Sequence, residues 1–361
     1  MPDQSSTSSE FLARPPRRTL TTTRFVPALL LALCAFFATG CPVPGIKRTV
    51  TVPSLVAPTA TADTAQLFAE INRLAAVRSI RGKVDVQFLD TSFAKCGVAE
   101  KYSTADGDII VQRPGQVYVS IKAPFIGTKI AEMTSDGERF RVAVLQGEER
   151  FRRFVQGTNA ADYERLQPGV MDEKDCGNDD KKKQRNQQRT VSALSGLRPQ
   201  HFTDALLVRP AAVENTNFTY ARSEFFQEEA DDRTGAKRNS RIVRGYYLLD
   251  EITPNGNMEA MLLRRFWFDR SEKNIRLARL QTYDAAGQLV TDVLYKNPQS
   301  FGDTLAVLLP ARLELTRPQE RYAIRITYQT PAEVIINRPY EAQAFVLQNQ
   351  WELPEVDLDK E

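Results

Sequence analysis

The chain has 361 residues, of which 48 are basic and 45 acidic, and its formal net charge is +3. A charge so close to balance argues against nucleic acid or an anionic membrane surface as a charge-driven partner. A folded part of about 300 residues would bury about three quarters of its unfolded surface, so stability does not require disulfide bonds.

The opening segment, residues 1–40, has the pattern of an export signal. Arg17, Arg18 and Arg24 stand just ahead of an uninterrupted apolar run, "ALLLALCAFFA", at residues 28–38. This run is shorter than the ~20 residues that a membrane-spanning helix needs, and Pro42 and Pro44 follow it closely. A basic region, a short apolar core and small residues at its end predict a secretory signal. An uncleaved anchor helix and an ordinary cleaved signal remain the alternatives.

The end of this run resembles a bacterial lipobox. Ala38, Thr39 and Gly40 are small residues directly before Cys41, although Ala38 stands where the motif usually has leucine. The resemblance implies cleavage before Cys41 and attachment of acyl chains such as palmitate to it. Two or three acyl chains hold a protein firmly at a membrane, whereas one holds it only marginally. By the sorting signal of enteric-type bacteria, Pro42 after the cysteine favours the outer membrane, facing the periplasm.

Residues 41–62 predict an extended tether, because they are rich in Pro, Thr, Ala and Val and have no period that would bury a face. A helix is expected next, at about 64–77. Leu67, Ile71 and Leu74 recur there at helical spacing, and Asp63 or Thr64 can cap its first turn.

From residue 80 the apolar period changes to two, which predicts a series of short antiparallel strands. The segments "IRGKVDVQF", "QVYVSI" and "RFRVAV" alternate apolar and polar residues, and turn signals such as Pro114-Gly115 and Asp136-Gly137 separate them. A meander of this kind forms one continuous antiparallel sheet.

A polar interruption follows. "AADYERL" predicts a short helix, and residues 172–189 predict a charged, solvated loop rather than a nucleic-acid site, because no aromatic residue is there to stack on a base. Cys96 and Cys176 can form a disulfide in an exported protein or remain as two free thiols. A second helix is expected at 199–208. It carries the single histidine, His201, which we interpret as an ordinary surface or capping residue.

The two-residue period returns from 215 to 348, and "EEADDRTGAKRN" predicts a long hairpin tip. The sequence therefore predicts an α+β fold, in which a large curved antiparallel sheet forms an incomplete, half-open β-barrel with a few helices on its concave side. We assign residues 63–350 to this domain, with 172–189 as an insertion, and 351–361 to a polar tail.

The segment "IVQRPGQVYVSIKAPFIGTKIAEMTSDGERFRVAV" resembles the LolA and LolB lipoprotein carriers and receptors and their mycobacterial lipid-binding relatives. The shared features are Arg113-Pro114 before a strand, Pro124 with Gly127 in the next turn, and Asp136-Gly137 before an aromatic-led strand. "FWFDRSEKNIRLARLQTYDAAGQLVTDVLY" is similar to a strand–turn–strand unit of that fold. The resemblance implies an apolar cavity for acyl chains and, in receptors, a protruding apolar loop.

These features predict a lipid-anchored envelope protein that binds acyl chains or lipoproteins. The residues that we expect to line the cavity are Val86, Phe88, Val119, Phe140, Phe266 and Phe268, although plain core packing would explain each of them too. Phe125 and Ile126 are the candidate protruding loop. The alternative is an envelope assembly or stress-sensing protein that uses the fold to bind other envelope proteins. No nucleophile motif, phosphate loop or metal cluster occurs, so we expect no enzyme, cofactor or metal.

Overall fold

The computed structural model describes residues 52–360 except 58, 91–99, 102–103, 124–125, 148, 150–151, 162, 164–198, 213–216, 234, 256–258, 272–273 and 305. The chain divides into two units, Met1–Val52 and Pro53–Glu361, and the second contains all the elements described below. No helix of the described residues is long and apolar enough to cross a membrane.

One sheet contains all 17 strands of the described residues. Its first strands in the chain are β1 (Ser54–Leu55), β2 (Ser79–Asp90), β3 (Glu100–Lys101), β4 (Ala105–Gln112), β5 (Gln116–Lys122), β6 (Lys129–Asp136), β7 (Arg139–Val144) and β8 (Arg153–Thr158). The later strands are β9 (Thr219–Ala230), β10 (Arg241–Asn255), β11 (Glu259–Asp269), β12 (Arg276–Tyr283), β13 (Leu289–Phe301), β14 (Val307–Arg317), β15 (Tyr322–Tyr328), β16 (Ile335–Ile336) and β17 (Glu355–Asp357).

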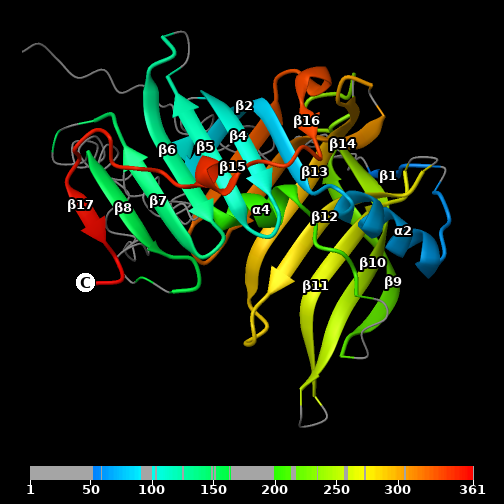
Figure 1. Ribbon diagram of the computed structural model, residues 1–361. Coiled ribbons are helices and arrows are strands. Elements are labelled where there is room, and N and C mark those ends of the chain that lie inside the picture. Colours follow the sequence, from blue (N-terminus) through cyan, green and yellow to red (C-terminus); the bar gives the residue numbers. More distant parts are fainter. Residues whose placement is uncertain are drawn as a thin grey trace, which may run out of the picture. The chain divides into compact units, whose positions relative to one another are not determined.

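The two meanders meet at β2 and form a continuous sheet (Figure 1). Antiparallel pairing runs without interruption from β9 through β10 to β15, on to β2 and then from β4 through β5 to β8. β3 and β16 pair with the two ends of β2. The sheet is open and mixed, because β1 pairs with β10 and β17 with β8 in parallel. These two parallel pairs correct the expectation of a purely antiparallel sheet.

Helices α2 (Thr64–Ala75) and α4 (Gln200–Leu206) pack against one face of the sheet, here called the helix face. Asp63 caps α2, since its carboxylate accepts the amide of Gln66 at 2.8 Å and the Gln66 side chain accepts the Asp63 amide at 2.9 Å. Leu67, Ile71 and Leu74 of α2 are buried in the same core cluster as the alternate apolar residues of the strands. Both helices therefore form close to where the apolar spacing predicts them.

His201 is a correction to the sequence interpretation. Only 3% of its surface is exposed, and its Nδ1 lies 2.6 Å from the Tyr322 hydroxyl and 3.9 Å from a carboxylate oxygen of Glu320. The position of α4 against the helix face places this imidazole over β15, so it is an internal hydrogen-bonding residue and not a surface one. No local pattern distinguishes the two cases.

The C-terminal segment crosses the opposite side of the sheet, here called the outer face, and ends beside β8 (Figure 1). The 3₁₀ helices η5 (Pro331–Glu333) and η6 (Ala342–Phe345) lie along its course. Leu353 packs there with Ala143 and Phe154 in a second small apolar cluster. Residues 351–360 thus belong to the folded unit and do not form a separate tail, because β17 and this cluster fix them to β7 and β8.

Candidate functional site

A cavity lies between the helices and the helix face of the sheet, and we call it the α2 cavity. Its volume is about 90 Å³. Its apolar wall comes from α2, from α4 and the residues after it, and from strands β2, β12, β13, β14 and β15. The apolar and aromatic residues of this wall are Leu74, Val77, Ile80, Leu206, Val208, Leu277, Ala278, Tyr295, Leu308, Leu309, Leu313 and Tyr328.

Three of the charged residues that border the cavity, Glu70, Arg73 and Asp269, form ion pairs within the protein. Arg73 of α2 binds Glu70 at 2.7 Å and donates to the Leu308 carbonyl at 2.6 Å. Asp269 binds the Arg244 guanidinium at 2.8 Å. These contacts tie α2 to β14 and fix the end of β11. The border therefore offers polar groups around an apolar interior, which is the usual composition of a ligand pocket.

Two tyrosines of the wall remain neutral at physiological pH. Burial raises the pKa of Tyr295 and of Tyr328 far above the ordinary value near 10. The Tyr295 hydroxyl donates to the Ala205 carbonyl at 3.2 Å, which links β13 to α4. Their rings thus form part of the apolar wall, and these two side chains add no formal charge to the cavity.

A pair of prolines marks a weak place in the sheet beside the cavity. Pro298 of β13 and Pro310 of β14 are direct cross-strand partners, and both line the α2 cavity. Proline has no amide hydrogen, so neither residue can donate a backbone hydrogen bond to the ladder at this point. This pair is the sequence signal that could have indicated where the sheet departs from close packing.

The six residues expected from the sequence to line a cavity lie elsewhere. Val86, Val119, Phe140, Phe266 and Phe268 are buried in the core cluster, and Phe88 packs against it with its ring 5.7 Å from that of Tyr322. None of the six is among the lining residues of the α2 cavity. Strand alternation identified their face correctly. Strand alternation could not identify which part of that face is filled by packed side chains and which part borders the cavity.

Several other predicted site residues lie outside the described residues. These are Ala38, Thr39, Gly40 and Cys41 of the lipobox, the two cysteines Cys96 and Cys176, and Phe125. Ile126 is described, and 79% of its surface is exposed in the turn between β5 and β6. Among the described residues, no group of three His, Cys, Asp or Glu side chains could hold a metal ion.

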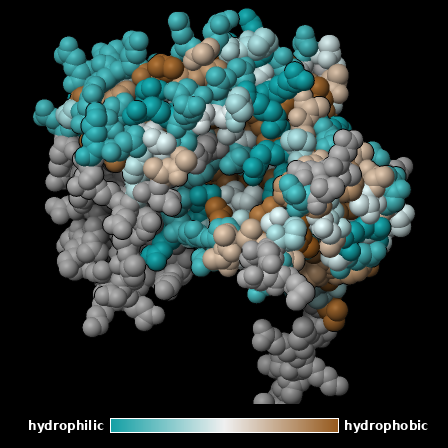
Figure 2. Space-filling view, turned by 60° about the horizontal axis from the view of Figure 1, so that its bottom comes forward, coloured by the Kyte–Doolittle hydropathy of each residue, from teal (hydrophilic) through white to brown (hydrophobic). Residues whose placement is uncertain are grey.

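The surface around these sites is mostly hydrophilic, with hydrophobic residues in small separate patches on the face that Figure 2 shows. Six large apolar residues of the described chain are well exposed: Val52, Leu55, Ile126, Phe225, Phe226 and Val346. Solvent-exposed apolar residues gathered in one place mark contact surfaces more often than scattered ones do.

Comparisons with known proteins show that this chain is similar to several solved structures. No family model matches the chain, and no curated protein matches its sequence. A LolA superfamily protein from Nitrosomonas europaea is similar at 12% identity with a TM-score of 0.36, over 79% of this chain and 99% of that one. A putative outer membrane lipoprotein-sorting protein domain from Vibrio parahaemolyticus has 10% identity and a TM-score of 0.36, over 78% of this chain and 95% of that one.

A DUF1329 family protein from Desulfovibrio piger is similar at 11% identity with a TM-score of 0.34, over 78% of this chain and 94% of that one. The structural neighbours of the chain thus include proteins of the superfamily that its sequence resembles. With TM-scores this low, we base the functional proposal on the cavity itself.

Proposed function

We propose that this chain is a lipid-anchored protein of the bacterial cell envelope that binds acyl chains in the α2 cavity. The observation that carries the proposal is the cavity itself, an apolar space between α2, α4 and the sheet with paired charges at its border. An interior of this composition excludes charged ligands, because desolvating an unpaired charge costs far more than an apolar cavity can return. It favours the methylene groups of a fatty acyl chain, each of which contributes ~0.8 kcal/mol when buried.

Trafficking of lipids or lipoproteins, or outer-membrane biogenesis, is the process that such a protein serves. The acyl group can belong to a free lipid or to the modified end of another lipoprotein. Cys41 would hold the protein at the outer membrane, with the folded unit in the periplasm, as the lipobox resemblance and Pro42 imply.

The size of the cavity sets an expectation about how a ligand enters. About 90 Å³ is well below the 300–1,000 Å³ of typical ligand pockets. We therefore expect a bound chain to push α2 away from β14, with the Arg73–Leu308 contact as the first to break. Helix α2 is suited to this movement because it is a single short helix that side-chain packing holds against the sheet.

Filling the cavity tests the proposal. In the unit Pro53–Glu361, Leu309→Trp places an indole where the acyl chain would lie, and Leu309→Phe fills it less. We expect displacement of a fluorescent fatty acid to weaken at least tenfold for Leu309→Trp, with a smaller loss for Leu309→Phe, since a tenfold change needs only ~1.4 kcal/mol.

Val346→Trp is the control, because Val346 is exposed on the C-terminal segment and does not line the cavity. Thermal unfolding of all three variants separates loss of binding from loss of folding. The acyl-binding proposal fails if the unaltered unit neither retains lipid in native mass spectrometry nor takes up the fluorescent fatty acid.

A second candidate is an envelope assembly or stress-sensing protein that presents its surface to protein partners. The observation that favours it is the exposed Ile126 in the turn between β5 and β6. Ile126→Ser would then abolish capture of an envelope protein while leaving fatty-acid displacement unchanged.

A further inference from the structure

A buried tyrosine hydroxyl in the wall of the α2 cavity has no hydrogen-bond partner. Tyr328 lines this cavity with 5% of its surface exposed, and its hydroxyl makes no hydrogen bond in the described part of the chain. Tyr295, the other tyrosine of the wall, donates to the Ala205 carbonyl at 3.2 Å. Tyr340 also has a buried hydroxyl without a partner, but it does not line the cavity. Tyr328 is therefore the tyrosine of this wall whose hydroxyl remains available.

Apolar contacts hold the ring of Tyr328 in place. Tyr328 is the last residue of β15 and is directly opposite Val84 of β2. The ring of Phe301 meets it edge to face, with 5.1 Å between the ring centroids. A Cβ atom on Gly82 would lie 3.3 Å from Cδ1 and 3.4 Å from Cε1 of Tyr328, so the ring lies over this glycine. Ile80, the next residue of β2 on the same face, lines the cavity too, so the ring is packed at the cavity itself.

An unpaired hydroxyl is an unfavourable group in such a wall. Buried polar groups of folded proteins are nearly always hydrogen-bonded, and a buried donor without an acceptor destabilises the fold. Burial alone raises the pKa of Tyr328, so the group remains a neutral O–H donor at physiological pH. Phenylalanine would supply the same ring without the unpaired group. An unsatisfied donor beside a proposed ligand site indicates a hydrogen bond that forms only when the ligand is bound.

We infer that the Tyr328 hydroxyl donates a hydrogen bond to the ester carbonyl of the bound acyl group, so that the cavity selects acyl esters over chains that lack the carbonyl. A neutral donor matches a neutral acceptor, and every ester-linked acyl chain carries such a carbonyl oxygen. A carboxylate fits less well, because the cavity would have to bury its charge. Since the cavity must widen to admit a chain, we expect the hydroxyl to become accessible in the same movement. The inference rests on the proposed function and deepens it from acyl chains in general to acyl esters.

A matched pair of ligands tests the inference on the full chain with Cys41→Ser, in which no acyl group of the protein itself competes. Monopalmitoylglycerol and its ether analogue, hexadecylglycerol, have chains of the same length, but only the first has a carbonyl. We expect the ester to displace a fluorescent fatty acid at least about fivefold more tightly than the ether, because the ether leaves the buried hydroxyl unpaired. In Tyr328→Phe the ratio of the two affinities should fall to about one, with the affinity for the ether unchanged or higher.

Thermal unfolding without ligand separates an effect on folding from an effect on binding. Tyr328→Phe removes a hydroxyl that has no partner, so the melting temperature should not fall. Tyr295→Phe removes the hydrogen bond to the Ala205 carbonyl and should lower it. Tyr118→Phe is the control for binding, because Tyr118 donates to Glu132 at 2.8 Å and does not line the cavity. This variant should keep the ester-to-ether ratio of the unaltered chain.

A dipalmitoyl-S-glycerylcysteine peptide, as a third competitor, identifies the source of the ester. Tighter displacement than by monopalmitoylglycerol assigns the ester to a lipoprotein and weaker displacement assigns it to a free lipid, and Tyr328→Phe should weaken the preferred ligand in either case. Equal affinities for ester and ether in the unaltered chain overturn the inference, as does an ester preference that survives in Tyr328→Phe. A chain that takes up no fluorescent fatty acid refutes the proposed function itself, so the two failures are distinguishable.

Discussion

Two adjacent residues of β10 form the same kind of ion pair on opposite faces of the sheet. Glu251 and Asp250 are directly opposite Arg264 and Arg265 of β11. Arg264 and Glu251 face the helices with 9% and 5% of their side chains exposed, and Arg264 also donates to the carbonyls of Arg209 and Pro210. Asp250 and Arg265 form a similar fork on the outer face, where they are 17% and 30% exposed.

The buried pair should matter far more for stability than its neighbour. Glu251→Gln leaves the Arg264 guanidinium buried without its counter-charge, so we expect the free energy of unfolding to fall by about 3 kcal/mol. Asp250→Asn removes the same charge beside a more accessible arginine and should cost at most about 1 kcal/mol. Urea denaturation of both variants measures the difference. Equal losses would show that the Glu251 site is hydrated.

Glu251 also organises the segment after α4. The Tyr220 hydroxyl donates to its carboxylate at 2.6 Å and accepts the amide of Ala212 at 2.9 Å. Burial, with the hydrogen bond to Glu251, raises the pKa of Tyr220 to about 12. A glutamate between "YLLD" and "ITPN" in the sequence carries no local sign of this role, because its partners, Tyr220 and Arg264, come from two other strands.

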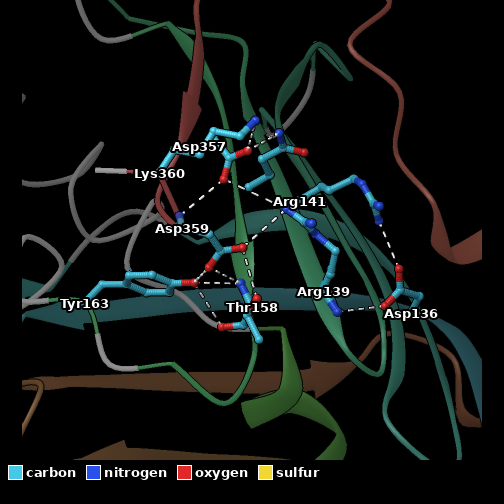
Figure 3. Close-up of polar contacts among 9 residues, drawn as sticks. Asp136, Arg139, Arg141, Thr158, Tyr163, Asp357, Asp359 and Lys360 are labelled. Atoms are coloured by element: carbon cyan, nitrogen blue, oxygen red, sulfur yellow. Dashed lines mark hydrogen bonds and ion pairs between the residues drawn. The ribbon is translucent and has the colours of Figure 1, made fainter.

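The C-terminal strand β17 is held by a cluster of polar groups at the edge of the sheet (Figure 3). Asp359 accepts hydrogen bonds from the Tyr163 hydroxyl, from the Thr158 amide at 3.2 Å and from the Thr158 hydroxyl at 3.0 Å. Arg139 of β7 lies 3.3 Å from Asp359 and 3.9 Å from Asp357. A three-residue strand has few backbone hydrogen bonds of its own, so these side chains contribute a large part of its attachment.

Acid should release this strand. The hydrogen bond from Tyr163 is the largest contribution that lowers the pKa of Asp359, and the bond from Lys360 is the largest that lowers that of Asp357. Groups with a lowered pKa stabilise the folded state above their ordinary pKa near 4 and lose this effect as pH falls through the lowered value. We expect the protection factor of the Leu358 amide, which donates to the Gln156 carbonyl at 2.9 Å, to be constant from pH 5 to 7 and to fall below pH 4.

Hydrogen exchange followed by NMR measures that protection factor, and the amide of Leu249 in the centre of β10 is the internal reference. Asp359→Asn should lower protection of Leu358 at pH 7 and flatten its dependence on pH. If protection at Leu358 follows that of Leu249 at every pH, β17 is part of the global unfolding unit and the polar cluster is not its attachment.

At the scale of the whole molecule, the proposal of an anchored protein depends on one thiol. Cys41→Ser removes the acceptor for the lipid and leaves the rest of the chain unchanged. We expect the protein to move from the membrane fraction to the soluble periplasmic fraction, because the acyl chains supply its affinity for the membrane. Gly40→Ala, which keeps a small residue before the cysteine, is the control. Retention of Cys41→Ser in the membrane fraction would identify the apolar run 28–38 as the anchor.

The sequence by itself determined the class of most elements. Period-two segments such as residues 80–88 and 322–328 became strands, and the spacing of Leu67, Ile71 and Leu74 became α2 with its Asp63 cap. Both patterns are local, because each depends on which face of an element is apolar. The hairpin tip at 231–240 could also be predicted from the sequence, since its turn residues lie between two long strands.

Only the tertiary structure decided where a cavity remains between these elements and which chain segments are attached to the sheet. Phe266 and Leu309 are alike in sequence as inward-facing strand residues and both belong to the core cluster, yet only Leu309 lines the α2 cavity. The difference arises from which helix covers each strand, and that depends on contacts between residues more than 200 positions apart, such as Arg73 with Leu308. In the same way, the attachment of β1 and of β17 to the sheet comes from long-range pairing that composition cannot indicate.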